Sequence, residues 1–321
     1  MTRRVPELVV DVLLVAVAAV WGASFLAAKE LVAETGVASG VALRFVVAAL
    51  ALGILCLARR ERMPRGPGLV IAAVLGCSQA AVIGLETAGV HLTSATNAGL
   101  LISLALVFTP VLESVAARSW LPRSYFVAAV AAVVGVALLV SGGGVRAPNL
   151  GDLLIVAAAI VRAVHVTASA RLTRNRRDST LAVVLVQMIV CAALSSAIAG
   201  AELPRAVAGL SPAGWVAVSF LGVLCSVFAF VVQLWAVRRT SATRASILMG
   251  TEPVWALAVG VALGGEALGP AGAVGAALLV AASYAGQAIE RRHRLSVHTR
   301  ESAASVRMPG GPERVGAAGP P

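Results

Sequence analysis

Thr93-Ser94-Ala95-Thr96 occurs a second time in this chain, as Thr240-Ser241-Ala242-Thr243. Both copies lie in long apolar stretches, and the same offset of 147 residues, without a gap, aligns further identical residues. These pairs are Ala98 and Ala245, Leu101 and Leu248, Val107 and Val254, and Leu121 and Leu268. The two halves of the chain are therefore predicted to be copies of one structural unit.

The composition indicates a protein of the lipid bilayer. Of the 321 residues, 59% are hydrophobic and 13% are charged, and the mean hydropathy is +0.91. A soluble domain of this length could not hide so much apolar surface in one core. A helix needs about 20 apolar residues to cross the bilayer. The stretches of about this length are 9–28, 37–58, 68–88, 94–116, 124–141, 152–171, 180–200, 213–236, 242–263 and 270–289.

The number of spans in each half predicts how the two copies are related. Each half has about five spans, and an odd number makes the second copy enter the membrane from the opposite side. The expected fold is an all-α polytopic membrane protein with about ten transmembrane helices in two inverted-topology five-helix repeats. The expected boundaries are a cytoplasmic N-tail (1–8), the first repeat (9–145), the second repeat (146–289) and a disordered basic cytoplasmic tail (290–321).

Basic residues are distributed unevenly between the two sides of the predicted bundle. Twenty of the 26 lie in the tails and in the loops on the same side as the tails, whereas only Lys29, Arg146 and Arg205 lie in the opposite loops. This asymmetry follows the positive-inside rule, so both termini are predicted to be cytoplasmic and the chain to lie in the plasma (inner) membrane. The net charge of +11 then faces anionic lipid, and no nucleic-acid partner is predicted.

Several motifs resemble those of a known family. Trp21-Gly22-Ala23-Ser24-Phe25 followed by Lys29 resembles the first-helix motif of EamA-type transporters in the drug/metabolite transporter superfamily. The repeated motif at 240–243, then Glu252-Pro253-Val254, Gly265-Glu266 and Gly275, follow the order of that family's ninth and tenth helices. The resemblance covers residues 9–289. It implies ten helices in two inverted repeats, a central polar cavity and transport of a small organic solute, often outward.

Charged residues inside a membrane are expensive, about 2.5–3.5 kcal/mol at the bilayer centre, and usually face a cavity or a partner. Arg44 and Glu86 lie in the second and third predicted spans and could meet. They would form either a gate or outer-cavity contact with solute, or a structural ion pair between the two helices. Gln187 and Gln233 stand at the corresponding positions of the second repeat.

Arg162 and His165 lie three residues apart in the sixth predicted span and therefore face nearly the same direction. A fixed cation beside a titratable imidazole could hold an anionic group of the solute. The alternative is that Arg162 pairs with a carboxylate elsewhere in the bundle, while His165 packs as a neutral interhelical donor.

Glu252 precedes Pro253 near the middle of the ninth predicted span, where the proline is expected to distort the helix. A carboxyl group at such a break is a candidate for proton coupling; the alternative is that it only shapes the helix by hydrogen bonding inside the bundle. Trp21, Ser24 and Asn97 could line the same cavity, although Trp21 could equally serve helix packing. Helices five and ten contain few polar residues and are expected at the periphery.

The leading functional hypothesis is a secondary transporter, working as an exporter by alternating access, driven by protons or by the solute's own gradient. The chain has no Walker A motif, no H-E-x-x-H, no G-x-S-x-G and no pair of intramembrane histidines. We therefore predict no enzyme activity, no catalytic residues, no metal site and no cofactor. The alternatives are a non-transporting membrane scaffold and, less favoured, an intramembrane enzyme. The predicted partners are a small-molecule solute and membrane lipid, and a homodimer is left open.

Overall fold

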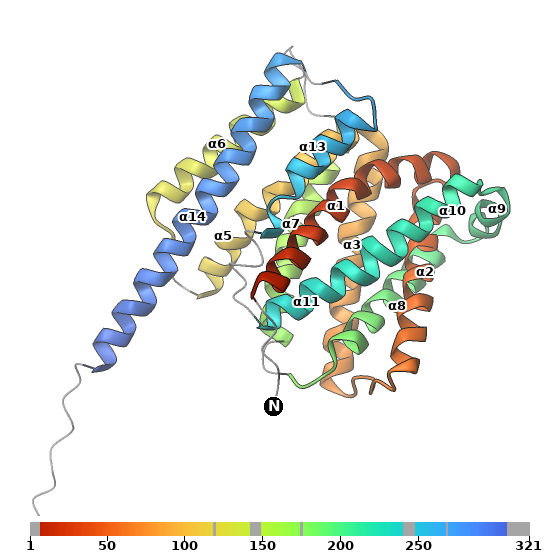
Figure 1. The fold of residues 1–321 in the computed structure, drawn as a ribbon, viewed down its shortest axis with the longest axis horizontal. Coiled ribbons are helices and arrows are strands. Elements are labelled where there is room, and N and C mark those ends of the chain that lie inside the picture. Colours follow the sequence, from red (N-terminus) through yellow and green to blue (C-terminus); the bar gives the residue numbers. More distant parts are fainter. Residues whose placement is uncertain are drawn as a thin grey trace, which may run out of the picture.

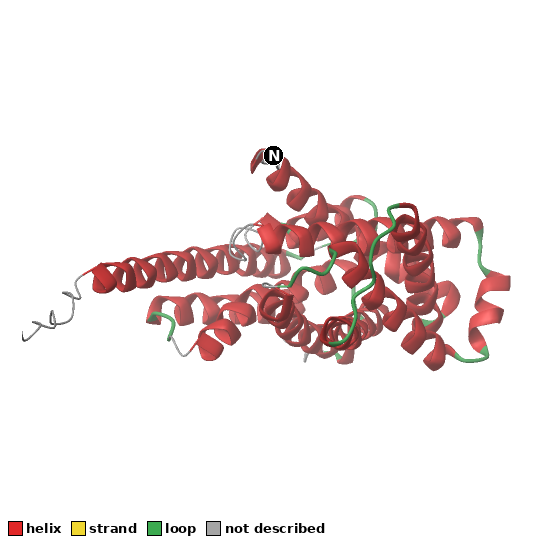
Figure 2. Ribbon diagram, turned by 90° about the horizontal axis from the view of Figure 1, so that it is seen from below, coloured by secondary structure: helices red, strands yellow, loops and turns green. Residues whose placement is uncertain are grey.

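The computed structural model describes residues 7–117, 120–141, 149–173, 176–239, 248–267 and 269–306. These residues form helices joined by loops, with no strand among them (Figure 2). The first half contains α1 (Glu7–Thr35), α2 (Val37–Ala58), α3 (Pro67–Leu92), α4 (Ala95–Leu101), the 3-10 turn η1 (Ile102–Leu104), α5 (Ala105–Ala117) and α6 (Arg123–Ser141). Because α4, η1 and α5 follow one another without a break, they make one long helix.

The second half begins with α7 (Leu150–Thr173), α8 (Thr180–Ala199) and the short α9 (Glu202–Gly209). It continues with α10 (Pro212–Ser219), the π-helical segment η2 (Phe220–Phe228) and α11 (Ala229–Arg239), which also form one long helix. The described part ends with α13 (Glu252–Ala262) and α14 (Pro270–Val306). The second copy of the repeated motif, Thr240–Thr243, lies outside the described residues.

The chain is a multi-pass membrane protein. Within the described ranges, eight helices are long and apolar enough to cross a bilayer. They are Leu8–Thr35, Val37–Ala58, Pro67–Leu92, Ala95–Val115, Leu150–Thr173, Thr180–Ala199, Pro212–Ala236 and Pro270–Ile289. The fifth and ninth predicted spans coincide with shorter apolar helices, Arg123–Gly135 and Glu252–Ala262. The count of ten spans therefore stays a prediction.

The ninth predicted span differs from its expected form, because Glu252 is not near the middle of a helix. It is the first residue of α13, so Pro253 lies in the first turn. A proline is tolerated there because its missing N–H would have no helical partner in any case. The N–H groups of Val254 and Trp255 both donate to the carbonyl of Thr251, at 3.0 and 3.4 Å. Glu252 thus starts a new helix instead of distorting a continuous one, and its negative charge suits a helix N-terminus.

The last helix also differs from expectation, since α14 stays helical to Val306 instead of becoming irregular from residue 290. The sequence explains this extension in local terms. Neither proline nor glycine interrupts 287–307, and Glu290 precedes Arg294 by four residues, a spacing that favours a helix. Residues 307–321 of the predicted disordered tail lie outside the described part.

Helix packing places two elements at one side of the molecule. In Figure 1, α6 and α14 lie side by side along one edge, and they pack on each other. Gly135 makes this contact close, because a Cβ atom there would lie 2.7 Å from the backbone nitrogen of Leu279. In the remainder of the bundle, α2 packs on α8, α3 packs on both α7 and α8, and α1 packs on α13.

The first copy of the repeated motif caps α4. The side-chain oxygen of Ser94 accepts a hydrogen bond from the N–H of Asn97 at 3.0 Å, as an N-cap serine does. The carboxylate of Glu266, from the segment between α13 and α14, accepts the N–H groups of Ala95 and Thr96, each at 2.8 Å. Lys29 lies 3.8 Å from Glu266. The motif therefore anchors a helix start to a loop of the other repeat.

This cap gives a first prediction. We expect Glu266→Ala to lower the free energy of unfolding by about 1–2 kcal/mol, because two N–H groups at the start of α4 lose their acceptors. Thermal unfolding of the purified protein in detergent measures the change. Glu30→Ala is the matched control, since Glu30 is an exposed glutamate of α1. Equal unfolding midpoints for the two variants would contradict the capping role.

Candidate functional site

Eight of the ten residues singled out in the sequence line one pocket inside the bundle. They are Trp21, Ser24, Arg44, Glu86, Arg162, His165, Gln233 and Glu252. A second pocket shares His165 and Gln233 with the first and adds Gln187. Asn97 lines neither of these pockets; its backbone N–H belongs to the cap of α4. That the side chain of Asn97 faces the cavity therefore stays a prediction.

A third pocket adjoins the first and shares Trp21, Arg162, Gln233 and Glu252 with it. We call the three adjoining pockets the central cavity. Their walls come from α1, α2, α3, η1 and α5 and from α7, α8, α11 and α13, with the segment just before α13. None of the described lining residues belongs to α6 or α14, the fifth and tenth predicted spans.

Arg162 and Glu252 form a two-pronged ion pair on the cavity wall. Nη1 and Nη2 of Arg162 donate to Oε1 and Oε2 of Glu252, at 3.1 and 2.8 Å. The guanidinium carbon also lies 4.7 Å from the centroid of the Trp21 ring, so the cation stacks on the aromatic face. Arg162 therefore pairs with a carboxylate of the bundle, which was the alternative to holding an anionic solute. The pair ties α7 to α13.

His165 shares a helical face with Arg162 but contacts a different helix. Its Nδ1 lies 2.7 Å from the hydroxyl of Ser78 on α3, and its Nε2 lies 3.5 Å from the hydroxyl of Ser169. The hydroxyl of Ser78 also donates to the carbonyl of Leu75 at 2.9 Å. His165 thus joins α7 to α3 through its hydrogen bond with Ser78.

Arg44 and Glu86 face the same pocket, and the ion pair that was one of the two alternatives for them is not formed. The Nε of Arg44 instead donates to the hydroxyl of Ser226 at 2.9 Å. Within the described part of the chain, the carboxylate of Glu86 has neither a hydrogen bond nor an ion pair, although its residue is only 9% exposed. Ser226, on a distant part of the sequence, therefore competes successfully for Arg44.

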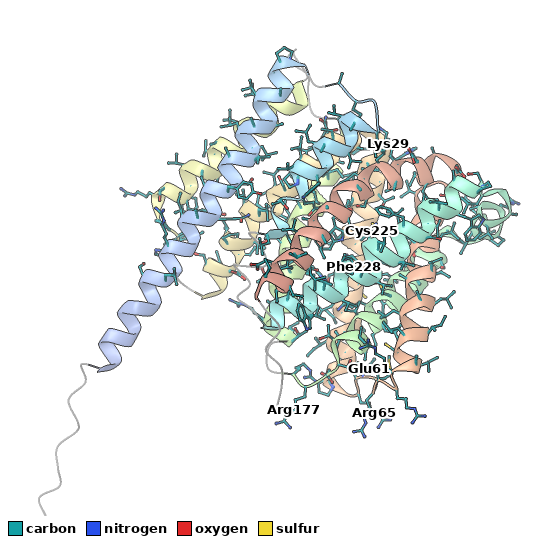
Figure 3. The ribbon with its side chains drawn as sticks, in the orientation of Figure 1. Lys29, Glu61, Arg65, Arg177, Cys225 and Phe228 are labelled. Atoms are coloured by element: carbon teal, nitrogen blue, oxygen red, sulfur yellow. The ribbon has the colours of Figure 1, made fainter. Side chains whose placement is uncertain are left out.

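Ser226 lies in η2, whose π-helical turns anchor two cavity side chains. Its hydroxyl donates to the carbonyl of Leu221 at 2.8 Å, and the carbonyl of Cys225 accepts the indole N–H of Trp21 at 3.0 Å. Figure 3 labels Cys225 and Phe228 in the interior of the bundle. Such π-helical segments are rare and frequent at functional sites.

The π-helical segment η2 was not predicted from the sequence. It covers Phe220–Phe228, inside the eighth predicted span (213–236).

Gln79 was also missed. It is 4% exposed and lines both the first and the second pocket. It lies seven residues before Glu86 on α3 and therefore on the same helical face. A polar residue in register with a charged one, inside an apolar span, could have identified it.

Comparison with known proteins gives the family. Residues 8–141 and 149–285 match the EamA-like transporter family, once in each predicted repeat. The chain belongs to this family. No curated protein matches this EamA-like chain. A solved structure described only as a crystal structure of a protein is 22% identical, with a TM-score of 0.63, over 87% of this chain and 97% of its own. At that identity the likeness concerns the fold alone.

Proposed function

We propose that this EamA-like chain is a secondary transporter that moves a small organic solute through the central cavity by alternating access. The observation that carries the proposal is the concentration of charged and amide side chains on the walls of a cavity between apolar helices. Such residues are costly in a bilayer and mark solute pathways. Outward transport rests on the family resemblance. A non-transporting scaffold would have no need of a polar cavity.

The packing of the helices supports an inverted repeat. When each helix is exchanged for its counterpart in the other half, the contact of α3 with α7 becomes a contact of η2 and α11 with α1, which is also present. The contacts of α2 with α8 and of α6 with α14 are each their own counterpart. Transporters with this architecture expose a site to each side in turn by moving one repeat against the other.

The charges in the loops support a location in the plasma membrane. They also support an orientation with both termini in the cytosol. Figure 3 labels Arg65 and Arg177 at one end of the bundle and Lys29 at the other. Basic residues are enriched on the cytoplasmic side of membrane proteins.

Proton coupling at Glu252 is part of the proposal. Protonation would remove the negative charge that holds Arg162 and would free α13 from α7, because the two helices are joined there by two charge-assisted hydrogen bonds. A solute cycle that opens this contact would then depend on pH. The same flux measurement that tests transport, repeated over a range of pH, tests the coupling.

The proposed function predicts solute flux by the purified protein. A thermal-shift screen against amino acids, nucleobases and organic cations is expected to find compounds that raise the unfolding temperature, because they bind only the folded state. A radiolabelled form of such a compound should exchange across liposomes that contain the protein and not across protein-free liposomes. A compound that stabilises the protein but never crosses the membrane would favour the scaffold instead.

A further inference from the structure

Glu86 is a buried carboxylate without a hydrogen bond or a contact ion pair among the described residues, although the positive charges of Arg162 and Arg44 act on it from a distance. It is 9% exposed, it faces the first pocket of the central cavity, and no described residue gives it a hydrogen bond or an ion pair. Burial of an ionised carboxylate without a partner is strongly unfavourable. The carboxylate oxygens of Glu86 are therefore free to accept hydrogen bonds from a cationic group that enters the cavity.

Three carboxamides accompany Glu86 on the cavity wall. Gln79 lies on the same face of α3 and is 4% exposed, Gln187 of α8 is 5% exposed, and Gln233 of α11 is half-buried. Gln79 and Gln233 line the first pocket together with Glu86, and they also line the second pocket together with Gln187. The three carboxamides and Glu86 therefore lie on one connected stretch of the cavity wall. None of them has a hydrogen-bond partner in the described residues. Their carbonyl oxygens are suitable acceptors for a donor-rich head group.

Both nearby arginines make their hydrogen bonds with groups other than Glu86. The guanidinium of Arg162 is taken by both oxygens of Glu252. Arg44 is held through its Nε by Ser226, which is 0% exposed and is itself fixed to the carbonyl of Leu221. Ser226 thus keeps Arg44 out of ion-pair contact with Glu86 and leaves the Glu86 carboxylate open to the cavity.

The third pocket has a different character. Its walls include Ile102, Leu106, Met249 and Pro253. The two hydroxyls on this wall are satisfied within their own helices, because Ser103 donates to Leu100 at 2.6 Å and Thr109 donates to Ala105 at 2.7 Å. The central cavity therefore has a polar lobe, around Glu86 and the three glutamines, and an apolar lobe on the side of α5 and η1. Trp21 lines both. Arg162, Gln233 and Glu252 lie at the boundary, because they line the first and the third pocket alike.

We propose that Glu86 is the counter-ion for an ammonium group of the solute, whose apolar part lies in the apolar lobe. An ammonium group donates three hydrogen bonds, which suits one carboxylate and neighbouring carboxamide oxygens. The ligand class is a small amphipathic amine. Ser226 is a positioning residue for this site, since it acts by holding Arg44. The inference rests on the proposed function for the identity of the ligand as solute.

Binding to the purified full chain in detergent tests the site. The probes are 2-phenylethylamine and its neutral analogue 2-phenylethanol. We expect the amine to bind roughly ten- to a hundredfold more tightly than the alcohol, the range of a hydrogen bond to a charged group. Glu86→Gln should remove this preference and leave alcohol binding unchanged.

Two further variants separate the site from a general structural effect. Ser226→Ala should weaken amine binding although Ser226 itself does not contact the ligand, because Arg44 is then free to approach Glu86. Glu30→Gln, at an exposed glutamate, should bind like the wild type. Absence of amine binding to the wild type, or an unchanged preference for the amine in Glu86→Gln, would overturn the proposal. Binding that depends on Glu86 without flux would overturn the transporter function and leave the ammonium site standing.

Discussion

Replacement of Arg162 by methionine is expected to lower the free energy of unfolding by about 3–5 kcal/mol. The substitution leaves the carboxylate of Glu252 buried without its cation, which is the costly way to break a buried ion pair. The side chains of Arg162 and Glu252 are 16% and 9% exposed, so little solvent is available to replace the lost partner. Chemical unfolding in detergent, followed by tryptophan fluorescence, measures the change.

The double variant Arg162→Met/Glu252→Met is the matched control for this prediction. It removes both charges at similar volume, so its stability should lie much closer to the wild type than that of Arg162→Met alone. The coupling free energy from the double-mutant cycle then reports the interaction of the two residues. Additive losses from the two single substitutions would show that the ion pair does not contribute to folding.

The sequence predicted the cavity better than it predicted the contacts inside it. Polar residues such as Arg44, Glu86, Arg162 and His165 had to turn away from lipid, and helices of one bundle can turn them only toward each other. Their common location therefore follows from hydropathy alone. Which residues pair depends on the rotation and depth of each helix, and these are set by packing across the whole bundle.

Particular residues show where this limit lies. The sequence suggested Glu86 as the partner of Arg44, but Arg44 donates to Ser226 instead. Ser226 lies in η2, the π-helical segment that packs on α2. Asn97 lies three residues after Ser94, and this is the spacing at which an N-cap serine accepts a backbone hydrogen bond. The N–H of Asn97 therefore belongs to the cap at the start of α4. Glu252 begins a helix since the following proline fits the first turn better than a helix interior. For Asn97 and Glu252, local rules for the start of a helix therefore outweighed the continuous span that the hydropathy predicted.

Close contact between α1 and α13 gives the second large prediction, at Gly22 beside Trp21. A Cβ atom at Gly22 would lie 2.5 Å from the Cβ of Trp255 and 2.7 Å from the backbone nitrogen of Ala256. The obstruction includes backbone, so α1 and α13 must move apart. We expect Gly22→Ala to lower the free energy of unfolding by about 1–3 kcal/mol, as overpacking does, even though alanine is the better helix former.

Gly84→Ala is the matched control, because Gly84 also lies within a helix, α3, and a Cβ atom there meets nothing within 4 Å. Helix propensity then acts alone and should raise the free energy of unfolding by up to about 1 kcal/mol. The two identical substitutions are thus expected to change stability in opposite directions. The change at Gly22 should also weaken the contact of Trp21 with Arg162, since α13 carries Glu252 and holds Arg162 in place. Equal effects at both glycines, measured by unfolding in detergent, would mean that α1 and α13 do not approach as closely as this structure has them.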